Sequence, residues 1–576
     1  MNSSRQGLLV EAWRIAKPYW RSDQKWSAML LLGIIITLTL GRVGLDVAFN
    51  YWYNSFYDAL QNYDSAAFYR LLLVFTGLAI LWVSVLTSLD FLSQWLRIRW
   101  RRWLTDLYLK RWLDHRAYYR LQLTGPSTDN PDQRIAEDVR DFIDYFLSLT
   151  LGLLRSIVSF FSFVFILWRL SGPLAIPLGS LGELTIPAYM VWLVIVYVIV
   201  GTFLSIKIGR PLVGLNFNQQ RFEADFRYSL VRLRENTESV AFYGGEAREF
   251  ETFHGRFGHV VANFWAIMWR QLKLGSFTFT FAQASVLFPY LIQAPRFFAK
   301  QITLGDLQQT GNAFNQVVDA LSFIINSYST IATWFAVVHR LATFDESVAE
   351  ILEKQKQPPS LPIVHQGVGL ETSSLALDLP DGRSLISGVA FDAKPGNALL
   401  IVGPTGVGKS TVLRAIAGIW PFGRGKVRLP EGRAFFVPQK PYIPLGTLRK
   451  ALAYPDSGHD IEDERLRAAL TRVGLGKFIP ELDTSDIWAQ RLSGGEQQRL
   501  AIARVLLAEP AVIFLDEATS ALDEGTEAQL YRMLRDAPWH PTIVSVGHRS
   551  TLKAFHDHVL DLTPFSRASL VAPAVG

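Results

Sequence analysis

Cysteine is absent from this chain of 576 residues, so disulfide bonds and thiolate metal sites are excluded. Formal charge is also absent from long stretches of the first part of the chain, and residues 184–206 contain no Asp, Glu, Lys or Arg. Hydrophobic residues make up 49% of the sequence, and its mean hydropathy is +0.18. Because a helix of about 20 apolar residues crosses the hydrocarbon core of a bilayer, the composition predicts a membrane protein. The first apolar run lacks a clear small-residue cleavage site, so we expect it to remain as a span.

Apolar stretches of sufficient length recur before about residue 345. Any one of them is compatible with a buried helix of a soluble core, and the third and sixth contain Arg155 and Asp319. Six stretches in succession favour membrane spans instead. The predicted spans are 27–49, 71–96, 145–168, 184–206, 274–295 and 317–338.

The basic residues of the connections predict the orientation, because short cytoplasmic loops collect Lys and Arg. Connections 53–69 and 171–182 are poor in them, and Arg296 and Lys300 are mild exceptions on that side. We therefore expect the N-terminus and the C-terminal part in the cytoplasm. The net charge of +6 is explained by basic residues that cluster beside the ends of the predicted spans, so no nucleic-acid partner is expected. The clustered residues are Arg14, Lys17, Arg21, Lys25, Arg97, Arg99, Arg101, Arg102, Lys110, Arg111, Lys207 and Arg210.

A Gly-rich segment at 403–410 fits the P-loop pattern, whose backbone N–H groups cradle phosphates. The apolar run 398–402 before it suits a buried strand, and 411–419 after it has helical character, so the bound phosphate would lie at a helix N-terminus. We expect Lys409 to reach the terminal phosphates and Ser410 to hold Mg²⁺. The predicted nucleotide-binding residues of this segment are Gly403, Pro404, Thr405, Gly406, Val407, Gly408, Lys409, Ser410 and Thr411.

Two further apolar runs end in residues that suit phosphate chemistry. The run 511–515 is followed by Asp516, where a carboxylate can join the Mg²⁺ shell, and then by Glu517, which is placed to polarise an attacking water. The run 542–546 leads to His548, a candidate contact of the γ-phosphate. Together with the P-loop, these residues predict ATP hydrolysis.

The C-terminal part, from about residue 370 to 565, resembles the nucleotide-binding domain of ATP-binding cassette (ABC) transporters, most specifically in the sequence Leu-Ser-Gly-Gly-Glu-Gln-Gln at 492–498. The resemblance implies ATP and Mg²⁺ as cofactors. It also implies a homodimer, because the signature of one cassette closes over the ATP held by the other. Carried over by position, it makes Glu517, His548 and Gln439 catalytic, and Ser410, Gln439 and Asp516 ligands of Mg²⁺. The further nucleotide-binding residues are Ser493, Gly494, Gly495, Glu496 and Asp523.

The sequence departs from this family pattern at the adenine base. Many members stack adenine on an aromatic residue before the P-loop, yet residues 375–385 contain no aromatic. Leu379 or Pro380 is the expected substitute, and weaker discrimination between nucleotides is expected, since aromatic stacking on a base contributes about 1–3 kcal/mol in nucleic-acid sites.

The connections 97–144 and 207–273 are too long and too charged for simple turns, and helical periodicity through 221–240 suggests helices that leave the membrane. This organisation resembles the exporter-type ABC fold. Within it, runs 130–139, 215–227 and 235–246 resemble the peroxisomal fatty-acyl half-transporters of ABC subfamily D and bacterial transporters related to the BacA peptide-uptake proteins. The predicted fold is therefore a polytopic all-α transmembrane domain of six helices followed by an α/β P-loop cassette. The predicted domains are 1–345 and 370–576, and the linker is 346–369.

Charged residues inside the predicted spans are candidates for lining a solute cavity, because charge in the bilayer is costly. For Arg42 and Asp46, mutual neutralisation at i,i+4 is the alternative. The resemblance implies a bulky amphipathic or hydrophilic solute, and we expect uptake of a peptide or cobalamin across a bacterial inner membrane. A fatty-acyl or lipid translocator is the alternative, and an ATP-gated regulator that moves no solute is a third hypothesis. The charged candidates are Arg42, Asp46, Asp90, Arg155 and Asp319.

Overall fold

The computed structural model describes residues 2–124, 130–177, 183–356, 360–457 and 461–566. The chain divides into two compact units, a membrane unit and a cassette unit. The membrane unit contains Met1–Leu109 and Asn130–Phe344, and the cassette unit contains Lys110–Asp129 and Asp345–Gly576. The domain limits predicted at residues 345 and 369 stay predictions.

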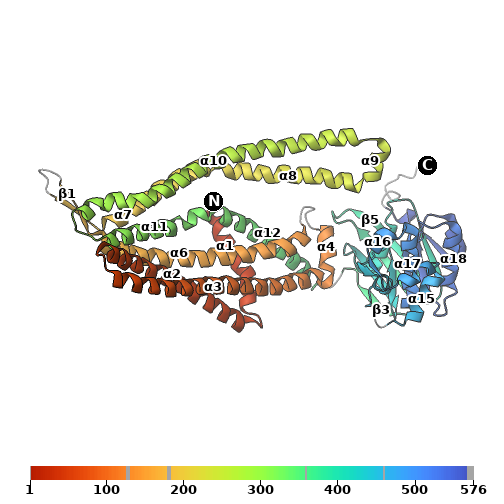
Figure 1. Ribbon diagram of the computed structural model, residues 1–576. Coiled ribbons are helices and arrows are strands. Elements are labelled where there is room, and N and C mark those ends of the chain that lie inside the picture. Colours follow the sequence, from red (N-terminus) through yellow and green to blue (C-terminus); the bar gives the residue numbers. More distant parts are fainter. Residues whose placement is uncertain (1, 125–129, 178–182, 357–359, 458–460, 567–576) are drawn as a thin grey trace. The chain divides into compact units, whose positions relative to one another are not determined.

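The membrane unit is helical apart from one small hairpin (Figure 1). By length and composition, five helical segments of the described chain are able to cross a membrane: Lys25–Gln61, Ser65–Leu123, Pro131–Ser171, Tyr189–Glu235 and Leu304–Lys354. The fifth predicted span, 274–295, lies within α10, which is not among those five. The helices are α1 (Asn2–Trp20), α2 (Lys25–Gln61), α3 (Ser65–Leu113), α6 (Val139–Ser171), α7 (Tyr189–Gly209), α8 (Pro211–Glu235), α9 (Thr237–Tyr243), α10 (Glu246–Phe298), α11 (Leu304–Asn326) and α12 (Tyr328–Lys354).

Two predicted spans differ from the helices in detail. The fourth was expected to begin at residue 184, but β2 (Glu183–Pro187) pairs antiparallel with β1 (Pro173–Pro177), and the helix begins only at Tyr189. The sixth, 317–338, lies within the spanning segment Leu304–Lys354, where α11 ends at Asn326 and α12 begins at Tyr328. Neither break was visible in hydropathy, because all of these segments are apolar.

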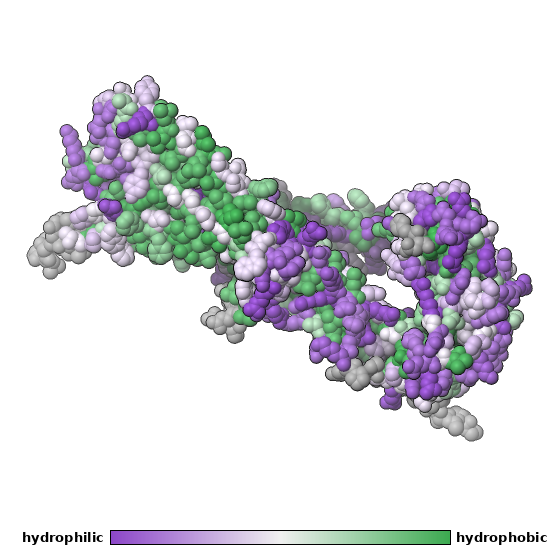
Figure 2. Space-filling model, turned by 90° about the horizontal axis from the view of Figure 1, so that it is seen from below, coloured by the Kyte–Doolittle hydropathy of each residue, from purple (hydrophilic) through white to green (hydrophobic). Residues whose placement is uncertain are grey.

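The surface of the membrane unit is apolar over a wide area (Figure 2). Helix α3 contributes Leu73, Ile80 and Phe91, whose exposed fractions are 76%, 64% and 67%. Large apolar side chains directed away from the protein are expected where lipid replaces water as the solvent. The exposed face of α3 is therefore a lipid-facing surface.

Polar contacts inside the bundle join α2, α3 and α6. Asp46 on α2 lies 3.8 Å from the guanidinium of Arg155 on α6. The indole N–H of Trp82 on α3 donates to the Asp46 carboxylate at 3.3 Å. Asp46 therefore pairs across helices, and among the described residues its ion pair within 4 Å is with Arg155 and not with Arg42, the alternative partner on its own helix. Asp90 accepts a hydrogen bond from Gln94 on its own helix and is exposed.

A buried carboxylate ties α12 to the start of α6. Asp138, whose side chain is only 3% exposed, lies 2.8 Å from Arg134 and 2.5 Å from Arg340. Two guanidinium groups on one buried carboxylate make a charge-assisted network that depends on every member. Asp138 thus joins segments that lie about two hundred residues apart in the chain.

The cassette unit contains two sheets. The larger is parallel, with strand order β13-β6-β12-β11-β8, in which β13 is His558–Asp561. Its central strands are nearly uninterrupted apolar runs because both faces are buried. The smaller sheet has the order β3-β7-β4-β5, formed by β3 (Ile363–Gly367), β7 (Gly423–Pro430), β4 (Leu370–Asp378) and β5 (Ser384–Ala393). The strands that position the site are β6 (Ala398–Val402), β8 (Ala434–Val437), β11 (Val512–Asp516) and β12 (Thr542–Val546), and the helices are α13 (Lys409–Ile416), α17 (Gly494–Ala508) and α18 (Glu524–Arg535).

The segment after α3 belongs to the cassette unit. Arg116 donates to the carbonyl of Ala417 at 3.1 Å, and Arg111 lies 2.6 Å from Asp345. His115 and Arg116 both have positive φ, 47° and 60°, which turns the chain sharply before α4 (Ala117–Thr124). Part of the predicted connection 97–144 is thereby attached to the cassette.

Candidate functional site

The predicted site residues follow the carboxyl ends of four strands of the parallel sheet. Strand β6 leads to the P-loop, β8 to Gln439, β11 to Asp516 and Glu517, and β12 to His548. Because the strands are parallel, their carboxyl ends meet at one edge of the sheet, where ligands of open α/β sheets bind. Segments that are more than one hundred residues apart in the chain therefore converge, as the Ser410–Asp516 hydrogen bond shows.

The P-loop wraps the ammonium group of Lys409. Its Nζ donates to the carbonyls of Gly403 and Pro404 at 2.9 and 3.0 Å. Burial lowers the pKa of Lys409, and the nearby carboxylates of Glu517 and Asp516 oppose that shift. Gly408 has a φ of 107°, and a Cβ there would lie 2.9 Å from Leu385 Cδ2, so the turn into α13 requires glycine.

Two oxygen donors lie together where a divalent cation was predicted. The hydroxyl of Ser410 donates to Asp516 Oδ1 at 2.7 Å. Burial raises the pKa of Asp516 above its usual range, and the Ser410 hydrogen bond and the charges of Arg414 and Lys409 only partly oppose that rise. A hydroxyl and a carboxylate fit Mg²⁺, which binds few protein oxygens and completes its shell with water and phosphate. No group of three or more His, Cys, Asp and Glu side chains that could hold a metal occurs in the described part of the chain.

Glu517 is held from two sides by the other predicted catalytic residues. The Gln439 amide donates to its Oε2 at 2.9 Å, and His548 Nε2 lies 3.2 Å from its Oε1. Glu517 has a positive φ of 49°, and its N–H donates to the carbonyl of Val546 on the next strand at 3.0 Å. Left-handed backbone in a non-glycine residue is strained and concentrates at functional sites. The structure therefore brings together all three residues predicted to be catalytic, whose roles stay predictions.

The signature residues begin helix α17 as a capping box. The hydroxyl of Ser493 accepts from Glu496 N at 3.3 Å, and the Glu496 carboxylate accepts from Ser493 N and Oγ, each at 2.9 Å. Lys477 Nζ lies 2.6 Å from the same carboxylate. Burial raises the pKa of Glu496, but the Lys477 ammonium and the Ser493 donors outweigh burial and lower it to about 2.

The signature is not joined to the P-loop of its own chain. In the described residues, no hydrogen bond or ion pair links residues 493–496 to residues 403–411. A Cβ at Gly495 would instead lie 3.2 Å from Leu522 Cδ2, and one at Gly494 would lie 3.7 Å from Ala521 Cβ. Gly495 therefore lets α17 approach residues 521–522 closely, whereas a Cβ at Gly494 would make only an ordinary contact.

Asp523 caps a helix. Its carboxylate accepts from Thr526 N at 2.9 Å and from Thr526 Oγ1 at 2.7 Å, at the start of α18. These hydrogen bonds lower the pKa of Asp523. The predicted nucleotide contact of Asp523 stays a prediction, because both observed contacts serve the helix.

Gln498, the last residue of the signature sequence, was not predicted to be a site residue. It is buried, with 3% exposed, and its Nε2 donates to the carbonyl of Gln439 and to Ser520 Oγ, both at 3.2 Å. Its Oε1 accepts from Ala521 N at 2.9 Å. One amide thus joins the signature helix to the Gln439 segment and to residues 520–521. The sequence did not predict these contacts, because it does not reveal which face of α17 meets the segments that follow β8 and β11.

Two arginines extend this connection. Arg504, further along α17, donates to the carbonyls of Ala451 and Tyr442 at 2.8 and 2.9 Å, and burial lowers its pKa to about 10. Arg549, directly after His548, donates to the carbonyls of Leu522 and Ser520 at 2.8 and 3.1 Å. Both were missed, because basic residues in helices and loops usually remain solvated.

The turn predicted to contact adenine is followed by Leu385, whose side chain lies against the P-loop. Leu379 N donates to the carbonyl of Arg383 at 2.8 Å, which closes a turn after β4 (Leu370–Asp378). Leu385, in β5 (Ser384–Ala393), is the side chain nearest to Gly408. Leu379 and Pro380 as adenine contacts stay predictions, and Leu385 joins them as an apolar neighbour of the P-loop.

Comparison with protein families and curated proteins agrees with this arrangement. Residues 15–298 match the model of ABC transporter transmembrane region 2, and residues 386–520 match the ABC transporter model. An uncharacterized ABC transporter ATP-binding protein of Haemophilus influenzae is 38% identical over 96% of this chain and 91% of its own length. The inner membrane ABC transporter ATP-binding protein YddA of Escherichia coli is 33% identical over 96% of this chain and 98% of its own length. The human lysosomal cobalamin transporter ABCD4 is 29% identical over 97% of this chain and 95% of its own length.

A solved structure shares the fold. The structure of a bacterial Atm1-family ABC exporter with ATP bound superposes with a TM-score of 0.67 at 20% identity, covering 93% of each chain. The prediction of a helical transmembrane domain followed by an α/β cassette in the exporter-type fold is confirmed. ATP with Mg²⁺ is the cofactor pair of this cassette. The chain belongs to the ABC transporter family, as a membrane-spanning half-transporter with one membrane unit and one cassette that is homologous to members of subfamily D.

Proposed function

We propose that this protein works as a homodimer that couples ATP hydrolysis to the uptake of a bulky, partly hydrophilic solute of the cobalamin class across a bacterial inner membrane. The observation that carries the ATP-driven part is the position of Glu517 between Gln439 and His548. A carboxylate fixed in this way accepts a proton from an attacking water without first having to reorient. The bacterial relative YddA, named as an inner membrane protein, supports the location.

The P-loop residues hold the nucleotide in this mechanism. Lys409 exchanges its hydrogen bonds to Gly403 and Pro404 for the terminal phosphates, and Ser410 and Asp516 supply the protein oxygens for Mg²⁺. Mg²⁺, when bound, neutralises charge that develops on the phosphates. Asp516 and Ser410 keep those oxygens in place, and Glu517 orients the water.

Dimerisation follows from the signature. Ser493 and Glu496 are ordered by their capping box but have no hydrogen bond or ion pair with residues 403–411 of the described chain. A second copy supplies the P-loop that the signature needs. Gln498 then connects the signature with the Gln439 segment, and Arg116 connects residues 110–124 with the cassette, so closure of the dimer reaches the membrane segments.

The polar group between α2 and α6 supports a solute with hydrophilic parts. Asp46, Arg155 and Trp82 lie together inside the predicted spans. Such charges usually face the bundle interior or a water-filled cavity. The relative named as a cobalamin transporter supports a large polar solute, whereas the relatives' names give no support to a peptide.

Uptake by transporter-deficient bacterial cells tests the proposal. Cells expressing the wild type should accumulate labelled cobalamin, and cells expressing Glu517→Gln should not. Arg155→Ala should lower accumulation more than Asp90→Asn, because Asp90 is exposed and its hydrogen bond in the described chain is to Gln94 of its own helix. Equal accumulation with the wild type and Glu517→Gln would reject uptake of cobalamin. ATP hydrolysis stimulated by lipid or acyl-CoA in that case would favour the fatty-acyl or lipid translocator.

A further inference from the structure

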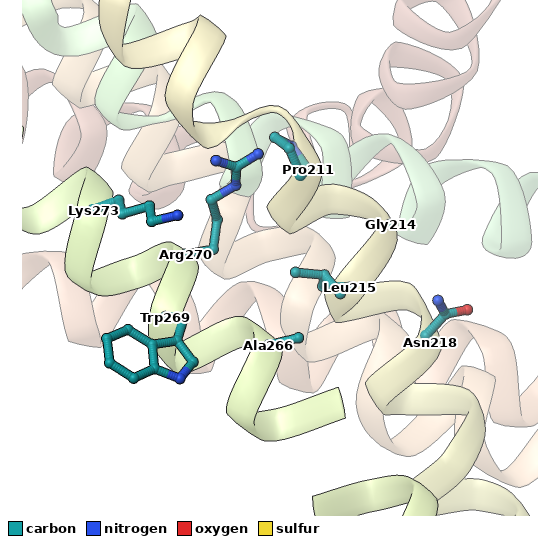
Figure 3. A pocket seen from close by; sticks show the side chains of 8 residues that line it. All are labelled: Pro211, Gly214, Leu215, Asn218, Ala266, Trp269, Arg270 and Lys273. Atoms are coloured by element: carbon teal, nitrogen blue, oxygen red, sulfur yellow. The ribbon is translucent and has the colours of Figure 1, made fainter. Parts of the chain in front are cut away.

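A groove of about 460 Å³ lies between helices α8 and α10. Gly214 and Leu215 of α8 form one wall, and Trp269, Arg270 and Lys273 of α10 form the other (Figure 3). The side chains of Arg270 and Lys273 both extend into the space between the two helices (Figure 3). Two cationic groups therefore share one groove.

No acidic residue of the neighbouring sequence balances these cations. Asp and Glu are absent from residues 184–222 and from residues 252–305. In the described part of the chain, Arg270 and Lys273 have no hydrogen bond or ion pair. Two like charges held close together without a counter-charge are unfavourable, and an anion in the groove removes that cost.

The groove begins where the apolar part of the chain ends. A Cβ at Gly209, the last residue of α7, would lie 3.4 Å from Leu274 Cδ2, so the end of α7 is level with Lys273. On the apolar side of this level, Phe203 and Ile206 are 65% and 57% exposed. Exposed apolar side chains of α7 thus lie within two turns of the level at which the cationic groove begins. Trp269, 59% exposed, suits this border because tryptophan concentrates at the membrane interface.

We propose that this groove binds the headgroup of an anionic phospholipid. The phosphate lies between the Arg270 guanidinium and the Lys273 ammonium, and an acyl chain follows the surface of α7 past Ile206. Guanidinium and ammonium groups are the usual partners of phosphate, and basic pockets between transmembrane helices on the cytoplasmic side bind anionic headgroups. The absence of a side chain at Gly214 leaves room for the headgroup, since nothing lies within 4 Å of a Cβ placed there. The bound lipid is a resident ligand and not the transported solute, so this inference goes beyond the proposed function, and it uses only the predicted cytoplasmic position of the groove.

Lipid retention by the purified full-length protein tests this proposal without requiring transport. The wild type, reconstituted with equal phosphatidylglycerol and phosphatidylcholine, should retain phosphatidylglycerol when analysed by native mass spectrometry. The double variant Arg270→Gln/Lys273→Gln should lower that retention by about tenfold or more, since each basic residue near a membrane surface contributes about 1 kcal/mol. The control Arg232→Gln/Arg234→Gln removes the same charge from exposed positions of α8 outside the groove and should change retention little.

A second variant keeps the charges and fills the space. Gly214→Phe lies on the opposite wall, and it should displace the lipid as the double variant does, even if the double variant folds poorly. Equal retention of phosphatidylglycerol by the wild type, the double variant and Gly214→Phe would overturn the proposal. Displacement of the lipid by millimolar glycerol phosphate would overturn it as well, because the groove would then be a site for a soluble phosphate. Since no ATP is present, failure of cobalamin uptake has no effect on either result.

Discussion

The cassette unit and the membrane unit encode their functions in different ways. In the cassette, short segments such as 403–410 carry their chemistry locally, and the sheet only has to bring them to one edge. In the membrane unit, the polar group of Asp46 and Arg155 joins two helices and follows no local motif. Chemistry shared by many transporters is therefore readable in the sequence of the cassette, whereas solute recognition depends on how the helices pack.

The largest effect is expected in the cassette, where a single carboxylate carries the chemistry. Glu517→Gln keeps the size of the side chain but removes the group that accepts a proton. ATP hydrolysis should fall by about 10²–10⁴-fold, the usual contribution of a general base. Phosphate release by the purified protein measures the rate, and nucleotide binding serves as the control because the P-loop is unchanged. Hydrolysis within threefold of the wild type would show that Glu517 is not the base.

The membrane unit should respond most strongly in stability. Asp138→Asn leaves Arg134 and Arg340 without their shared counter-charge, and such a loss from a buried ion pair costs about 3–5 kcal/mol. Thermal unfolding in detergent measures the change. Asp144→Asn is the matched control, because the Asp144 side chain is 43% exposed and its ion pair, at 3.8 Å, is with Arg97 and not with a member of the Asp138 network. Similar melting temperatures of the two variants would mean that the Asp138 network adds nothing to stability.

Gln498 tests whether the cassette also depends on tertiary contacts. Gln498→Leu leaves the N–H of Ala521 and the carbonyl of Gln439 without their partner, at about 1–3 kcal/mol for each buried group that stays unpaired. The misplaced Gln439 segment should lower kcat for ATP hydrolysis by about 10- to 100-fold, with KM for ATP nearly unchanged.

Gln497→Leu is the control for this substitution. Gln497 lies next to Gln498, and among the described residues its side-chain amide donates only to the carbonyls of Ala489 and Leu492, away from the Gln439 segment. It should lose stability without the same loss of kcat. If both variants lower kcat equally, Gln498 acts through general stability and not through position.

The smallest expected effect concerns the ion pair of Lys477 and Glu496. Since the pKa of Glu496 is lowered to about 2, the stabilisation is complete above pH 4.5 and is lost as the pH falls toward 2. Lys477→Ala should lower the melting temperature by about 1–3 °C at pH 7, and this difference from the wild type should shrink below pH 4.5. Lys426→Ala removes an exposed lysine without an ion pair among the described residues and is the control. A difference that stays constant down to pH 3 would contradict a role of the Glu496 charge.

The sequence predicted the parts of the fold whose signals are local. Apolar runs located the strands β6, β11 and β12, because strands buried on both faces are almost continuously apolar. It did not predict the pairing of β1 with β2 or the break at Ser327, because hydropathy does not distinguish an apolar strand or a break from a continuing helix. The pairing of Asp46 with Arg155 was not predicted for a related reason: the i,i+4 spacing showed only Arg42 as an alternative partner, and Arg155 comes from another helix.

By itself, the sequence determined that this protein spans a membrane and binds ATP through a cassette, because charge-free lengths and Gly-rich phosphate loops are physical requirements written in consecutive residues. Only the tertiary structure decided which side chains hold Glu517, that Gln498 joins the signature helix to the Gln439 segment, and that Arg270 and Lys273 share one groove with Gly214. These contacts depend on which faces of distant helices and strands meet, and side-chain packing in three dimensions sets that choice.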